Sequence, residues 1–183
     1  MGDSITQYWG GGPPAYPTVT ITALIPGGVD AGIAGQTTQE MQQRFAMDVL
    51  AWNPAIVVLL GGTNDLALEQ NPDTDAIAAM AEAAATAGAS VVIGTLPPSQ
   101  LWLGSTFLTQ AQTTPAITRF NSQLETLASA HGYLVADYYS AMLNPDGSSD
   151  QNLFLPDHIH PNADGYAVMW NVLRPVLATL ESR

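Results

Sequence analysis

The residues best suited to chemistry lie near the two ends of the chain. Ser4 follows Gly2 and Asp3, while Asp157 and His160 are three residues apart near the carboxyl terminus. In a loop before a helix, that spacing can bring the carboxylate to one imidazole nitrogen and leave the other free to accept a proton. A serine hydroxyl is a weak nucleophile that such a base activates. These residues predict nucleophilic catalysis, although Gly-Asp-Ser alone is also common in turns.

Asn64 is a third candidate because of its place after an apolar run. The run from Ile56 to Leu60 leads into Gly61, Gly62 and Thr63 and then Asn64. In parallel sheets ligands bind beyond the carboxyl ends of the strands. An Asn amide at such an end is a neutral donor suited to a developing oxyanion. The alternative is that Asn64 merely caps a turn, and these residues alone do not decide between the two.

The segments between these residues alternate as strands and helices. Three apolar runs predict buried parallel strands, namely Ile56 to Leu60, Val91 to Thr95 and Tyr133 to Ala136. Four segments predict helices. The first is capped by Thr37 and Glu40 and stops at Trp52-Asn53-Pro54, and the second runs from Asp73 or Thr74 to Gly88. The third runs from Thr114-Pro115 to near Gly132, and the fourth is capped by Asn162 and should be kinked or interrupted by Pro175. Thr18 to Ile25 alternates and predicts an extra strand or extended edge. The pattern is typical of an α/β layer fold, in a single domain over residues 1–183.

Composition limits the classes of partner. The 183 residues are 46% apolar and carry 16 acidic against four basic residues, all arginine, for a net charge of −12. Such a surface repels polyanions, which argues against nucleic acid and anionic lipid and favours neutral or cationic substrates. Cysteine is absent, so thiolate catalysis and cysteine-ligated zinc are excluded.

No apolar stretch approaches the ~20 residues needed to cross a bilayer. The amino terminus also lacks the basic start and apolar run of a signal peptide. The chain as given is expected to be soluble, either cytoplasmic or, if its amino terminus is truncated, secreted.

Four ordered blocks resemble those of the SGNH (GDSL-type) hydrolases. They are Gly2-Asp3-Ser4-Ile5-Thr6, Gly32-Ile33-Ala34-Gly35-Gln36-Thr37, Gly62-Thr63-Asn64-Asp65 and Asp157-His158-Ile159-His160-Pro161. The resemblance implies a three-layer, flavodoxin-like α/β sandwich with a mostly parallel central sheet. It implies Ser4 as nucleophile, His160 as general base and then acid, and Asp157 as the residue that orients His160. The oxyanion hole would consist of the backbone amides of Ser4 and Gly35 and the side-chain amide of Asn64.

The function implied by this resemblance is ester hydrolysis through an acyl-enzyme, without a cofactor. We expect a serine esterase acting on neutral short-chain acyl esters, either aryl esters or acetylated carbohydrates. The negative charge of the protein weighs against acyl-CoA and anionic phospholipid substrates. The expected partner is thus a small-molecule ester.

Three departures from the family pattern stand out. Asp30 lies where many relatives carry Asn two residues before the second block, which puts the structure of that loop in question. His158 adds a second imidazole to the last block, so Asp157, His158 and His160 could together bind a metal, although we expect none. The usual first strand before the Gly-Asp-Ser block has no residues here. Either Thr18 to Ile25 or a strand from a second subunit, in a homo-oligomer, could fill its place.

Two hypotheses from other classes remain. Tyr8, Trp9 and Trp102 beside Gly/Pro-rich loops could stack on sugars in a carbohydrate-binding module, or could instead line an acyl pocket or pack locally. The chain could also be a hydrolase-like scaffold inactivated by loss of the first strand. Turnover of an aryl acetate separates the enzyme from both.

Overall fold

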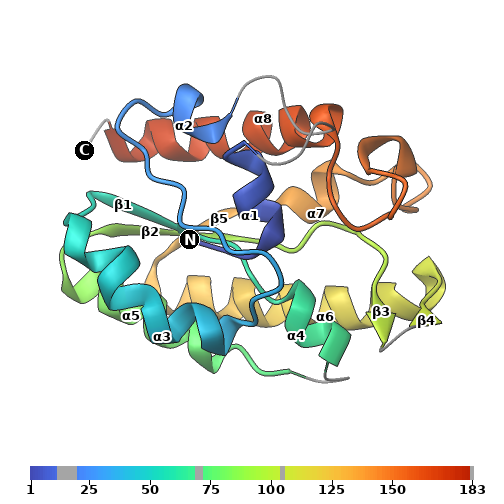
Figure 1. The fold of residues 1–183 in the computed structure, drawn as a ribbon, viewed down its shortest axis with the longest axis horizontal. Helices are drawn as coiled ribbons and strands as arrows, with labels where there is room; N and C mark the ends of the chain where they lie inside the picture. The colour runs from blue at the N-terminus through green and yellow to red at the C-terminus, as the bar shows by residue number, and fades with distance from the viewer. Residues whose placement is uncertain (12–19, 69–71, 104–105, 182–183) are drawn as a thin grey trace.

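The centre of the protein is a three-stranded parallel sheet (Figure 1). The computed structural model describes residues 1–11, 20–68, 72–103 and 106–181. The strands are β1 (Ile56–Leu59), β2 (Ser90–Gly94) and β5 (Leu134–Ala136), in the order β1-β2-β5. Val57 pairs with Val91, and Ile93 pairs with Val135. The three predicted strands are therefore confirmed to within one residue at each end.

Helices cover both faces of the sheet, which confirms the predicted three-layer α/β architecture (Figure 1). On one side lie α3 (Thr38–Asp48), α5 (Asp75–Thr86) and α6 (Gln110–His131), and on the other lie α1 (Ser4–Trp9), α7 (Tyr138–Ala141) and α8 (Ala163–Glu181). The short elements are α2 (Ile21–Leu24), η1 (Leu50–Trp52), α4 (Thr63–Leu68), η2 (Gln151–Leu153) and a hairpin of β3 (Trp102–Leu103) and β4 (Thr106–Phe107).

Two predicted helix caps are present. Thr37 and Glu40 form the capping box of α3, in which the Thr37 amide donates to the Glu40 carboxylate at 2.8 Å. At α8, the Asn162 side chain accepts from the amides of Asp164 at 2.9 Å and Gly165 at 3.1 Å. These side chains satisfy amides that have no partner inside the helix, and each such cap stabilises by about 1 kcal/mol.

Two helices contain a proline where the sequence predicted a helix start or a break. The helix expected to begin at Thr114-Pro115 begins at Gln110, with Thr109 as its cap, so that Pro115 lies inside α6. α8 continues through Pro175 to Glu181 without interruption. Its buried face, which includes Met169, Leu173 and Leu177, extends to both sides of the proline. Packing of that face outweighs the loss of one backbone hydrogen bond.

The strand expected over Thr18 to Ile25 does not form in its described part. Residues 18 and 19 lie outside the described residues, and Ile21–Leu24 form the short helix α2. Thr20 caps this helix, because its hydroxyl accepts from the Ala23 amide at 3.3 Å. The local cap outweighs the β-propensity of the branched side chains, which is a weak preference.

Met1 and Gly2 occupy the central place where the first strand was expected. Gly2 forms isolated parallel bridges to Gly32 on one side and Leu60 on the other. The Leu60 amide donates to the Met1 carbonyl at 3.1 Å, and the Met1 ammonium donates to the Val58 carbonyl at 2.9 Å. These contacts involve only the carboxyl-terminal part of β1.

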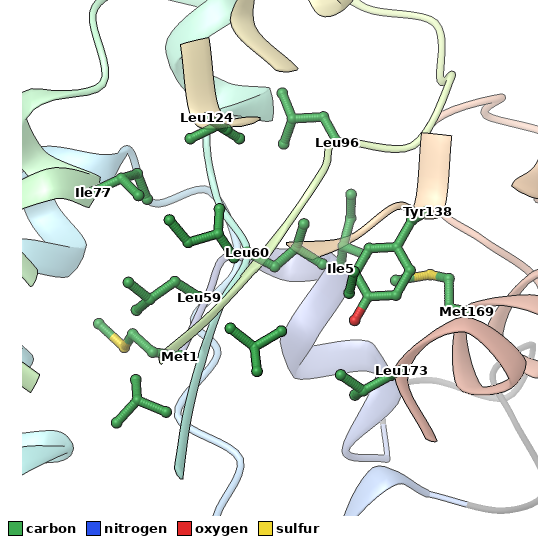
Figure 2. Packing of buried hydrophobic residues seen from close by; sticks show 14 of the residues in the cluster. Met1, Ile5, Leu59, Leu60, Ile77, Leu96, Leu124, Tyr138, Met169 and Leu173 are labelled. Atoms are coloured by element: carbon green, nitrogen blue, oxygen red, sulfur yellow. The ribbon is translucent and has the colours of Figure 1, made fainter. Parts of the chain in front are cut away.

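The apolar core lies on both faces of the sheet (Figure 2). Figure 2 shows Ile77 and Leu124, from α5 and α6, on one side of Leu59, and Met169 and Leu173, from α8, on the other. All five are at most 2% exposed. Fully burying such a side chain contributes about 1.5–3 kcal/mol. Among the described residues, no helix is both long enough and apolar enough to cross a membrane.

Candidate active site

Ser4 is held at the beginning of α1 by close backbone packing. The residue is 9% exposed, and the preceding Asp3 caps the helix by accepting from the Ile5 amide at 2.9 Å. A Cβ added at Gly2 would lie 2.6 Å from the Leu60 carbonyl oxygen, and one added at Gly32 would lie 2.2 Å from the Gln7 amide nitrogen. Only glycine permits this approach, which brings Gly2, Gly32 and Leu60 side by side at the carboxyl end of β1.

The loop before α8 orients His160 towards Asp157. His160 Nδ1 lies 2.8 Å from Asp157 Oδ2, and the amides of Ile159 and His160 donate to Asp157 Oδ1 at 2.9 and 3.0 Å. Partial burial acts to raise the pKa of Asp157, but the hydrogen bonds from the His160 ring and from the two amides outweigh burial and hold this pKa below its usual value. Asp157 is therefore an ionised carboxylate that holds the His160 ring in its orientation.

The other nitrogen of the same ring reaches Ser4. His160 Nε2 lies 2.8 Å from Ser4 Oγ. The structure thus brings together the three residues that the sequence singles out as nucleophile, base and orienting acid. This geometry allows a proton to pass from the hydroxyl to the imidazole while the carboxylate stabilises the resulting positive charge.

Asn64 and the Gly35 loop lie side by side. Asn64 lies in the first turn of α4, and its Nδ2 donates to the carbonyl of Gln36, the neighbour of Gly35, at 2.9 Å. Gly35 has φ +81°, which is the left-handed region. Because Gly2 bridges to Gly32 and Leu60, both segments leave the sheet beside Ser4. The side chain of Asn64 therefore connects the first turn of α4 to the loop that contains Gly35 and Gln36. This contact reaches further than the turn cap that the sequence suggested as an alternative.

Sequence reasoning missed the role of Arg44, which ties two of these loops together. From α3, its guanidinium donates to the carbonyls of Ala31 at 2.8 Å and Gly2 at 3.2 Å, and to the side chain of Gln36 at 2.6 Å. The side chain is only 14% exposed, and it also pairs with Asp48 at 3.0 Å. The capping box that begins α3 was the only sequence signal, and it places the helix without identifying these partners.

A second missed contact joins α4 to α3. Asp65 is 8% exposed and accepts from the Thr38 amide at 3.0 and 3.1 Å, and from the Thr38 hydroxyl at 2.5 Å. Hydrogen bonds to a buried carboxylate are among the stronger ones in proteins. This contact holds the turn that carries Asn64 against the first turn of α3.

Asp3 is an unusual buried carboxyl beside Ser4. It is 1% exposed, and its Oδ2 has no hydrogen-bond partner among the described residues. Burial raises the pKa of Asp3 to about 7, an effect to which the negative charge of Asp65 adds and which the Ile5 amide opposes. The group is therefore partly protonated at neutral pH.

The loop residues that departed from the family pattern have local roles. Asp30 accepts from the Gly32 amide at 2.7 Å and so shapes the turn before it. His158 has φ 58°, its Nδ1 lies 2.7 Å from Gln151 Oε1, and its carbonyl accepts from the Gln100 amide at 2.8 Å. Within the described part of the chain, no three His, Asp or Glu side chains gather as a metal site.

Of the two aromatic residues in α1, Trp9 is buried and Tyr8 contacts His160. Trp9 is 4% exposed and packs against Tyr138 and Tyr166, with ring centroids 6.2 and 5.5 Å away. It therefore packs locally and cannot stack on a sugar. Tyr8 lies edge-on to His160, with a centroid distance of 4.9 Å. The side chain of Trp102 is not among those described.

Comparisons with known proteins identify the family and the fold of this chain. The model of the GDSL-like Lipase/Acylhydrolase family matches residues 1–168. A GDSL-like lipase from Bacteroides thetaiotaomicron shares the fold with a TM-score of 0.76 at 24% identity, over 98% of this chain and 86% of that chain. A mutant of an acetylxylan esterase from Geobacillus stearothermophilus does so with a TM-score of 0.71 at 14% identity, over 95% of this chain and 90% of that chain. A comparison with curated proteins gives no significant match.

Proposed function

This chain belongs to the GDSL-like lipase/acylhydrolase family, and we propose that it is a serine esterase with Ser4, His160 and Asp157 as its catalytic triad. The observation that carries the proposal is the pair of 2.8 Å contacts that His160 makes, one to Ser4 and one to Asp157. A nucleophile, a base and an orienting carboxylate in hydrogen-bond contact are the arrangement required for acyl transfer.

In the proposed acylation step, Ser4 Oγ attacks the ester carbonyl and its proton passes to His160 Nε2. The C–O bond of the ester then breaks, and the alcohol leaves with that proton. A water molecule attacks the acyl-enzyme in the same way, with His160 as base and then as acid, and releases the carboxylic acid. Asp157 stays ionised throughout and stabilises the imidazolium.

The negative charge on the carbonyl oxygen needs donors that are in place before the reaction begins. We assign this role to the backbone amides of Ser4 and Gly35 and to the side-chain amide of Asn64. The assignment is supported by the bridges from Gly2 to Gly32 and Leu60, and by the contact of Asn64 with Gln36. Donors fixed in this way stabilise the transition state without reorganisation.

The proposed substrates are neutral esters with short acyl groups, either aryl esters or acetylated carbohydrates. The net charge of −12 disfavours approach of anionic substrates such as acyl-CoA. The cavity of about 400 Å³ beside β1 and α8 does not include Ser4, His160 or Asp157 among its lining residues. The burial of Trp9 removes one of the aromatic residues on which the carbohydrate-binding alternative depended.

Covalent trapping tests the triad directly. An alkyl fluorophosphonate should add one phosphonyl group to the intact protein, on the peptide that contains Ser4, and should abolish hydrolysis of an aryl acetate. The Ser4→Ala variant should take up no label. Labelling at another residue, or loss of wild-type activity on addition of a chelator, would overturn the assignment. A series of aryl esters from acetate to octanoate, followed by acetylated xylan and chitin fragments, then identifies the ester class.

A further inference from the structure

Gln7 joins the helix that carries Ser4 to the loop that carries Gly35. It lies three residues after Ser4 in α1, so the two side chains are neighbours on one face of this helix. The Gln7 side-chain oxygen Oε1 accepts from the Ala34 amide at 2.7 Å. Ala34 directly precedes Gly35, whose backbone amide is a proposed oxyanion donor. One side chain therefore connects the helix of the nucleophile with the loop of that donor.

The backbones of α1 and of this loop also touch at Gln7. The Gln7 amide donates to the Asp3 carbonyl at 3.0 Å. A Cβ added at Gly32 would lie 2.2 Å from the Gln7 amide nitrogen and 2.9 Å from the Asp3 carbonyl oxygen. The loop thus packs directly against the first turn of α1, and the Gln7 side chain extends this contact from Gly32 to Ala34.

The segment from Ile33 to Gly35 has few other supports. Its three residues are exposed, with Ile33 at 42%. The Ile33 amide donates to the Gly2 carbonyl at 3.1 Å, and the Gln36 amide donates to the Ile33 carbonyl at a longer 3.4 Å. Gly35 has φ +81°, and glycine is the most flexible residue of a chain. Without the bond from Ala34, this segment would be held only at its two ends.

We propose that Gln7 is a positioning residue for the oxyanion hole, which holds the Ala34 peptide so that the Gly35 amide points to the carbonyl oxygen of the substrate. The inference rests on the proposed function. Contacts with Gln36 hold the loop on the other side of Gly35, so Gln7 supplies the second anchor. A donor that is fixed before the reaction stabilises the oxyanion without reorganisation, and a displacement of ~1 Å loses much of this effect.

The alternative role for Gln7 is direct contact with the substrate through its Nε2, which has no hydrogen-bond partner among the described residues. The two roles need different atoms of one side chain. Positioning needs the acceptor Oε1, whereas substrate contact needs the donor Nε2. The observed bond uses Oε1 and therefore supports positioning, and variants that keep only one kind of atom separate the two roles.

Variants of the full chain at Gln7 test the inference. Gln7→Met keeps the length of the side chain and removes the acceptor, and it should lower kcat for an aryl acetate about 10-fold with KM almost unchanged. Gln7→Glu keeps an acceptor oxygen and removes the donor, and it should keep kcat near the wild-type value. Both are measured at pH 8 in 1 M NaCl, where a Debye length of about 3 Å screens the added charge. The matched control is Gln42→Met, on the exposed side of α3, which should keep full activity.

Hydrogen exchange of the Ala34 amide measures the bond independently of activity. It should be about fivefold faster in Gln7→Met than in the wild type and unchanged in Gln7→Glu. Unchanged exchange or unchanged kcat in Gln7→Met would overturn the inference. Equal losses of kcat in Gln7→Met and Gln7→Glu would assign Gln7 to substrate contact and would likewise overturn it. If Gln7→Met does not fold, Gln7→Asn takes its place with the same expected results, because its side chain is too short to reach Ala34.

Fluorophosphonate labelling distinguishes failure of this inference from failure of the proposed function. A wild type that is labelled at Ser4, together with equal kcat values in the wild type and the Gln7 variants, would refute only the role of Gln7. A wild type that is not labelled at Ser4 would refute the triad and the positioning role with it, even where the Ala34 exchange rates differ.

Discussion

His160 Nε2 lies 2.8 Å from Ser4 Oγ, although 156 positions separate the two residues in the chain. The contact depends on α8, whose Tyr166 hydroxyl donates to the Ile5 carbonyl of α1 at 2.8 Å. The loop that carries His160 precedes α8 directly, and Ser4 begins α1. The packing of these two helices on the same side of the sheet therefore sets the distance between Ser4 and His160.

The first prediction is that Ser4 and His160 act as one unit. Ser4→Ala should lower kcat for an aryl acetate by about 10⁶, and the double variant with His160→Ala should be no worse than either single variant. Steady-state kinetics on the three proteins measures this. The Ser122→Ala variant, on the exposed side of α6, is the matched control and should keep full activity. Additive losses of activity in the double variant would contradict the prediction that Ser4 and His160 act together.

The second prediction concerns Asn64. If the Asn64 amide is an oxyanion donor, its removal in Asn64→Ala should lower kcat by about 10² to 10³ and leave KM almost unchanged. The lost hydrogen bond to Gln36 should lower the free energy of unfolding by only ~1 kcal/mol. Kinetics and thermal unfolding of the same preparation separate the two effects. Near-normal turnover together with a lowered midpoint would leave Asn64 a structural role alone.

Local sequence signals identified most of the elements. The apolar runs of β1, β2 and β5 predict buried parallel strands because nothing polar interrupts them, and the capping residues Thr37 and Asn162 mark the beginnings of α3 and α8. The hairpin of β3 and β4 was missed because two-residue strands give no periodic signal.

The supporting contacts of the site could not be predicted. The bonds of Arg44 to Gly2 and Ala31 join residues 42 and 13 positions away, and nothing near Arg44 in the chain indicates those partners. The raised pKa of Asp3 likewise arises from burial by the folded chain. The candidate catalytic residues were recognisable from their types and their order in the chain. The residues that hold them in place are brought together only by tertiary packing.

The third prediction concerns the pH dependence of kcat/KM. Activity should fall on acidification, because protonated His160 cannot accept the Ser4 proton. The pKa of Asp157 lies below its usual value, so this carboxylate stays ionised between pH 5 and 8 and does not cause the loss. Asp157→Asn should lower kcat by up to ~10⁴ across that range, because the ring loses its orientation. A flat wild-type profile from pH 5 to 8 would contradict the assignment of His160 as base.

The fourth prediction is that Arg44 positions the loops of the site. Arg44→Lys keeps the charge, but a single ammonium lacks the fork that reaches Gln36, Ala31 and Gly2. Turnover should fall about 10- to 100-fold, because displacements below 1 Å are costly. Asp48→Asn removes only the ion pair, whose acid is 42% exposed, and should change stability by less than ~0.5 kcal/mol. Equal effects of the two variants on kcat would refute the positioning role.

The final prediction concerns the stability cost of Asp3. Its pKa is raised to about 7 in the folded protein from an ordinary value of 3.8. Between these two pH values the folded state binds more protons than the unfolded state, so this group lowers stability as the pH rises. The full penalty, on the order of 4 kcal/mol, is present above pH 7 and vanishes below pH 4.

Asp3→Asn removes the charge and keeps an oxygen to accept from the Ile5 amide. The variant should therefore gain stability over the wild type at pH 8 and gain much less at pH 4.5, as measured by urea unfolding. The Met1 ammonium, with its pKa lowered to about 6, has the opposite slope, but it is common to both proteins and cancels in the difference. Glu125→Gln, on the exposed face of α6, should stay within ~0.5 kcal/mol of wild type at both pH values. If the gain from Asp3→Asn is the same at pH 4.5 and 8, the buried carboxyl is not the source of the pH dependence.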